Sequence, residues 1–382
     1  GIQNILAYGI NQRFQMEYST LADAYKKNEL EPQTGLGIFS LSSIPVDKAE
    51  PSESLRATVA WQAGLTPEKT LLSSRQLDAF RRGGPLSQKA VQGLGVAAES
   101  AFLPGDGVQL HAVLAGPQDG PLAILLHGFP ECWYSWRHQI PILVDAGYRV
   151  VVPDQRGYNF SDKPAGVQAY QIDRLTADVA SLIRALGRSQ ATIIGHDWGG
   201  VVAWRLAMDR PDVVDRLVVL NAPHPVVFAK ALRADSAQRR RSWYMFAFQM
   251  PWLPEALLSV APRATVRLLL QGTAVREQAF SEHDLEVMAA ARAQPGAAQA
   301  MIHWYRATFR YGPAKRASAI EAPTMLIWAE DDVALGKPLT YGLERWVPDL
   351  ELQYIPRCGH WVQNEAPAEV NRELLGFLRR GA

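Results

Sequence analysis

The feature that most limits the fold of this chain is a regular alternation of short apolar runs with amphipathic segments, beginning near residue 97. The apolar runs end in turn residues. Continuous apolar runs of this length indicate strands buried on both faces of a parallel sheet. They are LAILLHGF, which ends at residue 129, and the runs at 148–157, 191–196, 216–223 and 323–330.

Helical patterns lie between these runs. The segment 171–187 has helical spacing of apolar residues and ends on Gly187, as expected of a helix C-cap. The segment 199–211 ends at Pro211, because proline cannot continue a helix. Strands that alternate with helices predict an α/β fold with an open, doubly wound, mostly parallel sheet.

The alternation is interrupted at residues 224–319 by a stretch rich in Arg, Trp, Phe, Leu and Ala. We interpret this stretch as an inserted helical cap domain, or lid, over the carboxyl ends of the strands, where such sheets bind ligands. The α/β core is then expected at 97–223 and 320–382. Residues 1–96 are expected to form a partly helical N-terminal extension of unknown fold.

Within that extension, TLADAYKKNEL and PEKTLLSSRQLDAFRR have helical patterns, and Gly83 and Gly84 are expected to close the second helix. The segment GLGVAA at 93–98 superficially matches a dinucleotide fingerprint. It follows no strand and opens no βαβ unit, so a linker is expected there.

Charge and cysteine content exclude several function classes. Lys and Arg number 39 against 38 Asp and Glu, so the net charge of +1 gives no reason to expect a nucleic acid or an anionic membrane surface as partner. The three arginines at 239–241 are interpreted as a solvated helix face. No stretch approaches the ~20 apolar residues of a membrane span.

The two cysteines, Cys132 and Cys358, cannot form a disulfide framework, and neither has a metal ligand at useful spacing. They are expected to be reduced thiols, and the protein is expected to be cytoplasmic, because no signal peptide is visible. No metal is expected. The sequence leaves the oligomeric state open between monomer and homodimer.

The segment GHDWGG at 195–200 joins a predicted buried strand to a predicted helix. Glycines flank its central Asp197 at the spacing of the nucleophile elbow, the sharp strand-to-helix turn of α/β-hydrolases. The pattern therefore predicts a carboxylate nucleophile at this turn. The structural alternative is that Asp197 only caps the following helix.

Two residues downstream complete the predicted chemistry. Asp332 follows the run 323–330, and His360 follows the predicted strand LELQYI. The order of elbow residue, acid and histidine is that of a catalytic triad in this fold. The adjacent Glu330 and Asp331 remain alternatives for the acid.

An oxyanion hole is predicted upstream, in the segment HGFP at 127–130. In this fold the loop after that strand contributes one backbone N–H group, and the residue after the nucleophile contributes another. Phe129 and Trp198 are therefore expected to donate these two N–H groups.

Residues 97–382 resemble the soluble-type epoxide hydrolases of the α/β-hydrolase superfamily. The resemblance rests on HGFPECWYSW, PDQRGYNFSDKP, GHDWGG, LNAPHP, WAEDD and CGHW. Two lid segments also match: SWYMFAFQMPWLPE places Tyr244 at the family's first lid tyrosine, and HWYR places Tyr305 at the second. The sequence departs from the family at Ala329 and Asn159, where glycine is usual. The resemblance does not reach residues 1–96.

The resemblance implies an enzyme that uses no cofactor, takes a small apolar epoxide and water, and releases a vicinal diol. The site residues it implies are the nucleophile Asp197, the general base His360 with its orienting acid Asp332, the lid proton donors Tyr244 and Tyr305, and the pocket residues Phe129, Trp198 and Trp361.

A carboxylate at the elbow suits this reaction. A serine that attacked an epoxide carbon would form a stable ether, whereas Asp197 would form an ester that water can cleave. His360 is expected to be a neutral base with a pKa near its ordinary value of about 6.5.

Three alternatives stay open. A haloalkane dehalogenase would use the same triad, but halide leaves without a proton, so the lid tyrosines favour an epoxide; Phe129 also stands where many dehalogenases have a halide-binding asparagine. A non-enzymatic receptor could use the same fold, although it would need no regenerating base. Residues 1–96 could form a separate partner-binding module.

Overall fold

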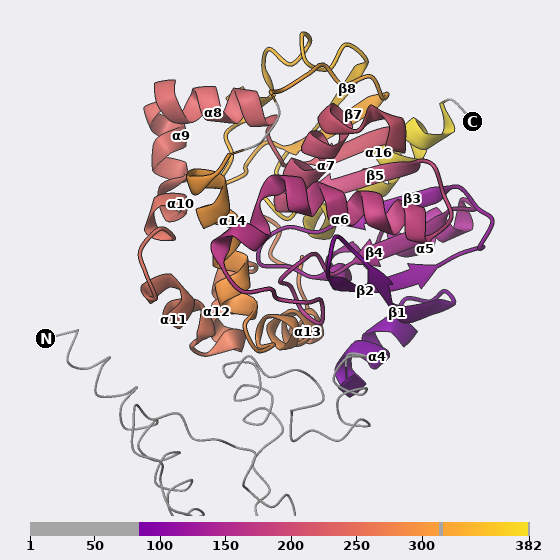
Figure 1. Ribbon diagram of the computed structural model, residues 1–382, viewed down its shortest axis with the longest axis horizontal. Helices are drawn as coiled ribbons and strands as arrows, with labels where there is room; N and C mark the ends of the chain where they lie inside the picture. Colours follow the sequence, from indigo (N-terminus) through magenta and orange to yellow (C-terminus); the bar gives the residue numbers. More distant parts are fainter. Residues whose placement is uncertain (1–83, 313–315, 381–382) are drawn as a thin grey trace, which may run out of the picture. The chain divides into compact units, whose positions relative to one another are not determined.

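The computed structural model describes residues 84–312 and 316–380 (Figure 1). The two expected helices of the N-terminal extension, and Gly83, lie outside the described residues. Helix α4 (Gly84–Gln92) is the first described element and begins at Gly84. The segment after α4 leads directly into the first strand, and Leu94 within it is buried.

The described residues contain one mixed sheet, with strand order β1-β2-β4-β3-β5-β6-β7-β8. The pairs β1–β2 and β2–β4 are antiparallel, and the remaining pairs are parallel. The expected open, mostly parallel sheet is therefore confirmed. The strands are β1 (Ala98–Pro104), β2 (Gln109–Ala115), β3 (Leu122–Leu126), β4 (Arg149–Pro153), β5 (Ala191–His196), β6 (Val214–Leu220), β7 (Thr324–Ala329) and β8 (Leu350–Ile355).

The apolar runs of the sequence are strands with helices packed on both faces. In β3, Ile124 and Leu126 join one core cluster, whereas Ala123 and Leu125 join the other. Helices α6 (Ile172–Ala185) and α7 (Trp198–Asp209) supply the first cluster. Helices α4, α5 (Ile140–Asp145) and α16 (Pro367–Arg379) supply the second. Burial on both faces explains why these strands are apolar throughout.

A second group of helices interrupts the sheet between β6 and β7, and we refer to them as the cap helices. Figure 1 shows them gathered beside the sheet. The Trp304 indole N–H donates to the carbonyl of Arg156 at 3.0 Å, which ties this group to the loop after β4. The cap helices are α8 (Pro225–Ala234), α9 (Ser236–Arg241), α10 (Trp243–Ala247), α11 (Leu253–Ser259), α12 (Pro262–Leu269), α13 (Glu282–Arg292) and α14 (Ala297–Arg310).

Short elements complete the described chain: the 3₁₀ helices η3 (Trp133–Trp136), η4 (Val167–Tyr170), η5 (Pro211–Val213) and η6 (Lys337–Thr340), and the helix α15 (Val362–Glu365). Among the described helices, none has both the length and the apolar character needed to cross a bilayer. Cys132 and Cys358 are both unpaired and buried.

Candidate active site

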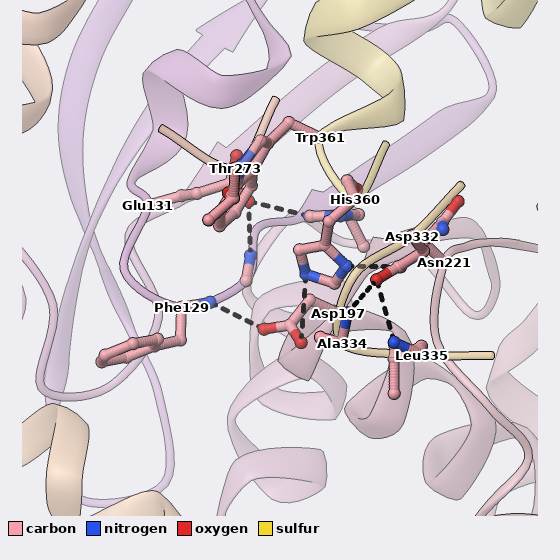
Figure 2. Close-up of polar contacts among 12 residues, drawn as sticks. Phe129, Glu131, Asp197, Asn221, Thr273, Asp332, Ala334, Leu335, His360 and Trp361 are labelled. Atoms are coloured by element: carbon pink, nitrogen blue, oxygen red, sulfur yellow. Dashed lines mark hydrogen bonds and ion pairs between the residues drawn. The ribbon is translucent and has the colours of Figure 1, made fainter. Parts of the chain in front are cut away.

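Four predicted site residues follow the carboxyl ends of strands in the same sheet. Phe129 follows β3, Asp197 follows β5, Asp332 follows β7 and His360 follows β8. These strands are parallel, so their carboxyl ends lie along one edge of the sheet, where α/β folds bind ligands. Figure 2 shows the side chains of Asp197, Asp332 and His360 pointing toward one another.

The turn that holds Asp197 is sharp and closely packed. Asp197 has φ 49° and ψ −119°, a backbone conformation that non-glycine residues rarely adopt. The chain passes so close to β3 that a Cβ at Gly199 would lie 2.1 Å from the carbonyl oxygen of Leu126. A Cβ at Gly128 would likewise lie 2.5 Å from the Cβ of Asp197. Glycines at both positions therefore let the nucleophile loop and the HGFP loop meet.

The Asp197 carboxylate faces the site rather than its own helix. Asp197 is the N-cap residue of α7 by position, but its side chain accepts no capping hydrogen bond from that helix. One oxygen accepts a hydrogen bond from the N–H of Phe129 at 2.8 Å, and the other lies 3.6 Å from Nε2 of His360. The capping alternative is therefore wrong, because both oxygens are oriented toward other groups.

The structure distinguishes the three candidate acids. Oδ2 of Asp332 lies 2.7 Å from Nδ1 of His360, and the Asp332 side chain is buried. Glu330 instead pairs with Lys337, and Asp331 is exposed. The geometry brings only Asp332, of these three carboxylates, to the histidine.

Asp332 is held by hydrogen bonds from two directions (Figure 2). Its Oδ2 also accepts from Nδ2 of Asn221 at 2.7 Å. Its Oδ1 accepts from the backbone N–H groups of Ala334 and Leu335 at 2.8 and 2.9 Å. Burial alone would raise the pKa of Asp332, but the charge and hydrogen bond of His360, followed by the hydrogen bonds from Asn221 and Leu335, lower it.

The ionisation of His360 is governed by its two carboxylate neighbours. Burial alone would lower its pKa, but the carboxylates of Asp332 and Asp197 raise the pKa of His360 well above its usual value. Burial would raise the pKa of Asp197, but its contact with His360, together with the Phe129 N–H, lowers this pKa. The imidazole of His360 therefore lies between two carboxylates that favour its protonated form while Asp197 is ionised.

The predicted N–H donors lie beside Asp197. Phe129 donates directly to the Asp197 carboxylate, and the N–H of the preceding Gly128 donates to Oε2 of Glu131. Trp198 is the first residue of α7, where helix N–H groups have no partner within the helix. One N–H group thus comes from the loop after β3 and the other from the first residue of α7, directly after Asp197.

Tyr305, on α14, packs among aromatic rings that include Phe129 and Trp198 of this site. Its ring centroid lies 5.0 Å from Trp198, 5.4 Å from Phe129 and 4.9 Å from Phe248, with edge-to-face geometry. Tyr244, on α10, lies 6.0 Å from Tyr305. The cap helices thus bring the two predicted tyrosines together beside the two residues of the predicted oxyanion hole.

Both tyrosines are neutral at physiological pH. Burial is the main reason that the pKa of Tyr244 and the pKa of Tyr305 are raised far above the usual phenol value. The negative charge of Asp197 raises both pKa values further. Each hydroxyl therefore keeps its proton and can donate it to a group in the site.

Sequence reasoning missed a buried pair behind the triad. Nδ1 of His196 lies 2.8 Å from Oε2 of Glu131, and Nε2 of His196 lies 2.8 Å from the carbonyl oxygen of His360. Glu131 also accepts from the N–H of Gly128 at 3.2 Å and from Nε2 of Gln363 at 3.1 Å. Glu131 therefore links the HGFP loop, the end of β5 and the His360 loop.

The remaining predicted pocket residue, Trp361, lies behind the histidine. Its ring centroid is 4.8 Å from that of His360 and 5.9 Å from that of His196. Its indole N–H donates to Oγ1 of Thr273 at 2.9 Å, which links it to the segment between α12 and α13 (Figure 2). Within the described part of the chain, no cluster of three or more His, Cys, Asp or Glu side chains could hold a metal.

Comparison with known proteins agrees with this architecture. Residues 121–367 match the family model described as the alpha/beta hydrolase fold. The AB hydrolase superfamily protein YfhM of Bacillus subtilis (strain 168) is 42% identical over 278 residues, which cover 73% of this chain and 97% of that protein. Epoxide hydrolase 3 of Xenopus tropicalis is 35% identical over 316 residues, covering 81% and 86% of the two chains.

A solved structure is also similar. The Bacillus megaterium epoxide hydrolase, crystallised with an inhibitor, superposes with a TM-score of 0.68 at 30% identity, covering 73% of this chain and 99% of that one. This chain therefore belongs to the α/β-hydrolase fold family, and within it to the epoxide hydrolases. It is accordingly a hydrolase.

Proposed function

We propose that this hydrolase opens an apolar epoxide to a vicinal diol through an ester formed on Asp197. The observation that carries the proposal is a carboxylate at the elbow, in contact with a histidine and faced by two protonated tyrosines. A hydrolase that attacks an acyl carbon needs no acid on the opposite side of its substrate. An epoxide does need one, because its oxygen becomes an alkoxide as the ring opens.

In the first step, Asp197 attacks one ring carbon from the side opposite the carbon–oxygen bond that breaks. Tyr244 and Tyr305 hydrogen-bond the epoxide oxygen, and one of them transfers its proton as negative charge develops there. The low pKa of Asp197 keeps the nucleophile ionised. The product of this step is a hydroxyalkyl ester of Asp197 and a tyrosinate.

The ionisation of His360 links the first step to the second. Forming the ester removes the negative charge of Asp197, which is one of the two charges that raise the pKa of His360. The imidazolium then loses its proton, and the tyrosinate regains one. This transfer leaves a neutral His360, which is the form that a general base requires.

In the second step, His360 takes a proton from water as the water oxygen attacks the ester carbonyl of Asp197. The N–H groups of Phe129 and Trp198 stabilise the resulting oxyanion, a contribution of about 3 kcal/mol for each donor. Collapse expels the diol oxygen, which takes the proton from His360. The Asp197 carboxyl then ionises and protonates His360, which restores the starting state.

The side chains that contact the ring of Tyr305 are largely aromatic. The rings of Phe129, Phe248 and Trp198 surround Tyr305, and this environment favours an aryl or alkyl substituent on the epoxide. We assign residues 224–319 to a lid that excludes water from the first step. No cofactor takes part in either step.

A single-turnover reaction in ¹⁸O-labelled water tests this mechanism. The ester route predicts that the label enters the Asp197 carboxylate, which mass spectrometry of the peptide containing Asp197 detects, and that the first diol released is unlabelled. Label in that diol would show that water attacks the epoxide directly. Loss of Asp197, as in Asp197→Ala, should abolish diol formation.

A haloalkane dehalogenase is the competing proposal, because it would use the same three residues. The two tyrosines argue against it, since a leaving halide needs no proton. Measuring chloride release from a chloroalkane beside diol release from styrene oxide distinguishes the two activities. Chloride release without diol release would replace our proposal.

A further inference from the structure

The outer side of the cap helices carries large apolar side chains in contact with solvent. Trp243 on α10 is 67% exposed, and Trp252 at the start of α11 is 72% exposed. Tryptophan is a largely buried residue in folded proteins, so two such side chains facing water require an explanation. We define the aromatic patch by its exposed members, which are Trp243, Phe246, Met250, Trp252, Phe309 and Tyr311.

Members of the aromatic patch on two different helices contact each other. The rings of Phe246 on α10 and Phe309 on α14 are 5.4 Å apart. Arg306, on α14, donates hydrogen bonds to the carbonyls of Phe248 and Met250 at 3.0 and 2.6 Å. These contacts fix the connection between α10 and α11 against α14. Figure 1 shows α9, α10 and this connection along one outer edge of the cap helices.

A basic segment precedes the aromatic patch in the chain. Residues 233–241 contain four arginines and one aspartate, and Asp235 is used to cap α9. All four arginines are exposed. In the described part of the chain, none of the four forms an ion pair with a carboxylate; Arg239 and Arg241 donate to backbone carbonyls. The overall charge of +1 therefore conceals a local excess of positive charge.

We propose that the aromatic patch and its arginines dock on the surface of an anionic lipid bilayer. Tryptophan and tyrosine rings favour the headgroup level of a membrane, and arginines beside them are attracted to anionic lipids. The occupant is a lipid surface rather than a second copy of the chain. A two-fold dimer through this patch would add a second set of arginines to the interface, whereas an anionic bilayer supplies the opposite charge.

Docking in this way has a consequence for the site, which rests on the proposed function. Tyr244 lies on α10 between Trp243 and Phe246, so the helix that touches lipid also carries a proton donor. An apolar epoxide dissolved in the bilayer would then be concentrated beside the cap helices. Vesicle binding itself requires no epoxide, so its failure would leave the proposed reaction intact.

Co-sedimentation of the full chain with vesicles tests the proposal. We expect binding to phosphatidylcholine vesicles that contain phosphatidylglycerol, and weaker binding to phosphatidylcholine alone. Each arginine near an anionic surface contributes about five-fold in partitioning, so Arg233→Gln with Arg240→Gln should weaken binding ~25-fold on the anionic vesicles. Salt at about 0.5 M should remove most of the same difference.

A second pair of variants tests the aromatic contribution. Trp243→Gln with Trp252→Asn should weaken binding to both kinds of vesicle at least ~10-fold. Asparagine suits position 252 because Trp252 has φ 51°, which asparagine tolerates. Leu268→Gln is the matched control, because Leu268 is 69% exposed on α12 but is not part of the aromatic patch.

Three results would overturn the proposal. The first is a full chain that does not sediment with anionic vesicles at low salt. The second is a Leu268→Gln variant that loses as much binding as the tryptophan pair. The third is a dimer, measured by light scattering, that the tryptophan variants convert to monomer without any vesicle binding, which would assign the aromatic patch to a second copy.

Discussion

The substitution Asp332→Asn should separate the two steps of the proposed reaction. Asp332 is 2% exposed, and its carboxylate accepts hydrogen bonds from His360, Asn221 and two backbone N–H groups. An amide has one acceptor oxygen, so it cannot satisfy both the His360 side and the backbone side. The imidazolium that forms during ester hydrolysis would then lose its counter-charge and its orientation.

The expected size of the effect follows from that loss. Replacing the buried acid of a catalytic triad by its amide lowers turnover about 10⁴-fold, or ~5.5 kcal/mol in the barrier. We expect this loss in ester hydrolysis and less than a ~10-fold change in ester formation, because Asp197 attacks without help from a base. The unfolding free energy should fall by about 1–3 kcal/mol, because buried donors lose an acceptor.

The assay is a single-turnover reaction followed by rapid quenching. Intact-mass analysis measures the ester on the protein, and chromatography measures the released diol, so the two rates are obtained separately. Asp331→Asn is the matched control, because Asp331 is adjacent and exposed. Equal losses in both steps, or the same behaviour in Asp331→Asn, would refute the role assigned to Asp332.

Four further results are expected. His360→Gln should accumulate the ester, seen as added substrate mass on the protein; a variant that turns over normally would contradict the scheme. Tyr244→Phe and Tyr305→Phe should each slow ester formation about 10²-fold and leave hydrolysis of a preformed ester unchanged, as rapid-quench rates would show. Glu131→Gln should lower the unfolding free energy by about 1–3 kcal/mol in urea titrations, because an amide has one acceptor oxygen for donors that both carboxylate oxygens now serve; an unchanged midpoint would argue against those contacts. Because the pKa of His360 is raised, its protonated form stabilises the fold below its ordinary pKa, and this stabilisation is lost as pH rises through the raised value. The stability difference between wild type and His360→Gln should therefore shrink as the pH rises above the ordinary histidine pKa of about 6.5.

Local sequence patterns were sufficient for the parallel strands of the sheet and for the position of the elbow. The parallel strands are apolar because both of their faces are covered, and glycines are required around Asp197 by close backbone contacts. The hairpin of β1 and β2 was not identified, although β2 is buried at every position after its first. Its identity as an antiparallel addition to the sheet depends on pairing with β4, which local periodicity does not reveal.

Long-range contacts account for most of what the sequence did not reveal at the site. Asp332 can be distinguished from the two neighbouring carboxylates only when the loop conformation is known, because that conformation points its side chain toward His360. The Glu131–His196 pair joins residues that are 65 positions apart, and only their presence in HGFPE and GHDWGG could have marked them. The charge of His360 depends on having two carboxylates around one ring, which is a property of the assembled site.

The site residues come from two separate parts of the chain, and this separation affects how the substrate class of such an enzyme can change. Asp197, Asp332 and His360 stand on the sheet, whereas Tyr244 and Tyr305 stand on helices inserted between β6 and β7. In the proposed reaction, the residues that follow the sheet strands hydrolyse the ester. The two tyrosines of the cap helices activate the bond that breaks in the first step. Replacing the cap helices would thus direct the enzyme toward substrates with other leaving groups, while the triad would still hydrolyse the ester.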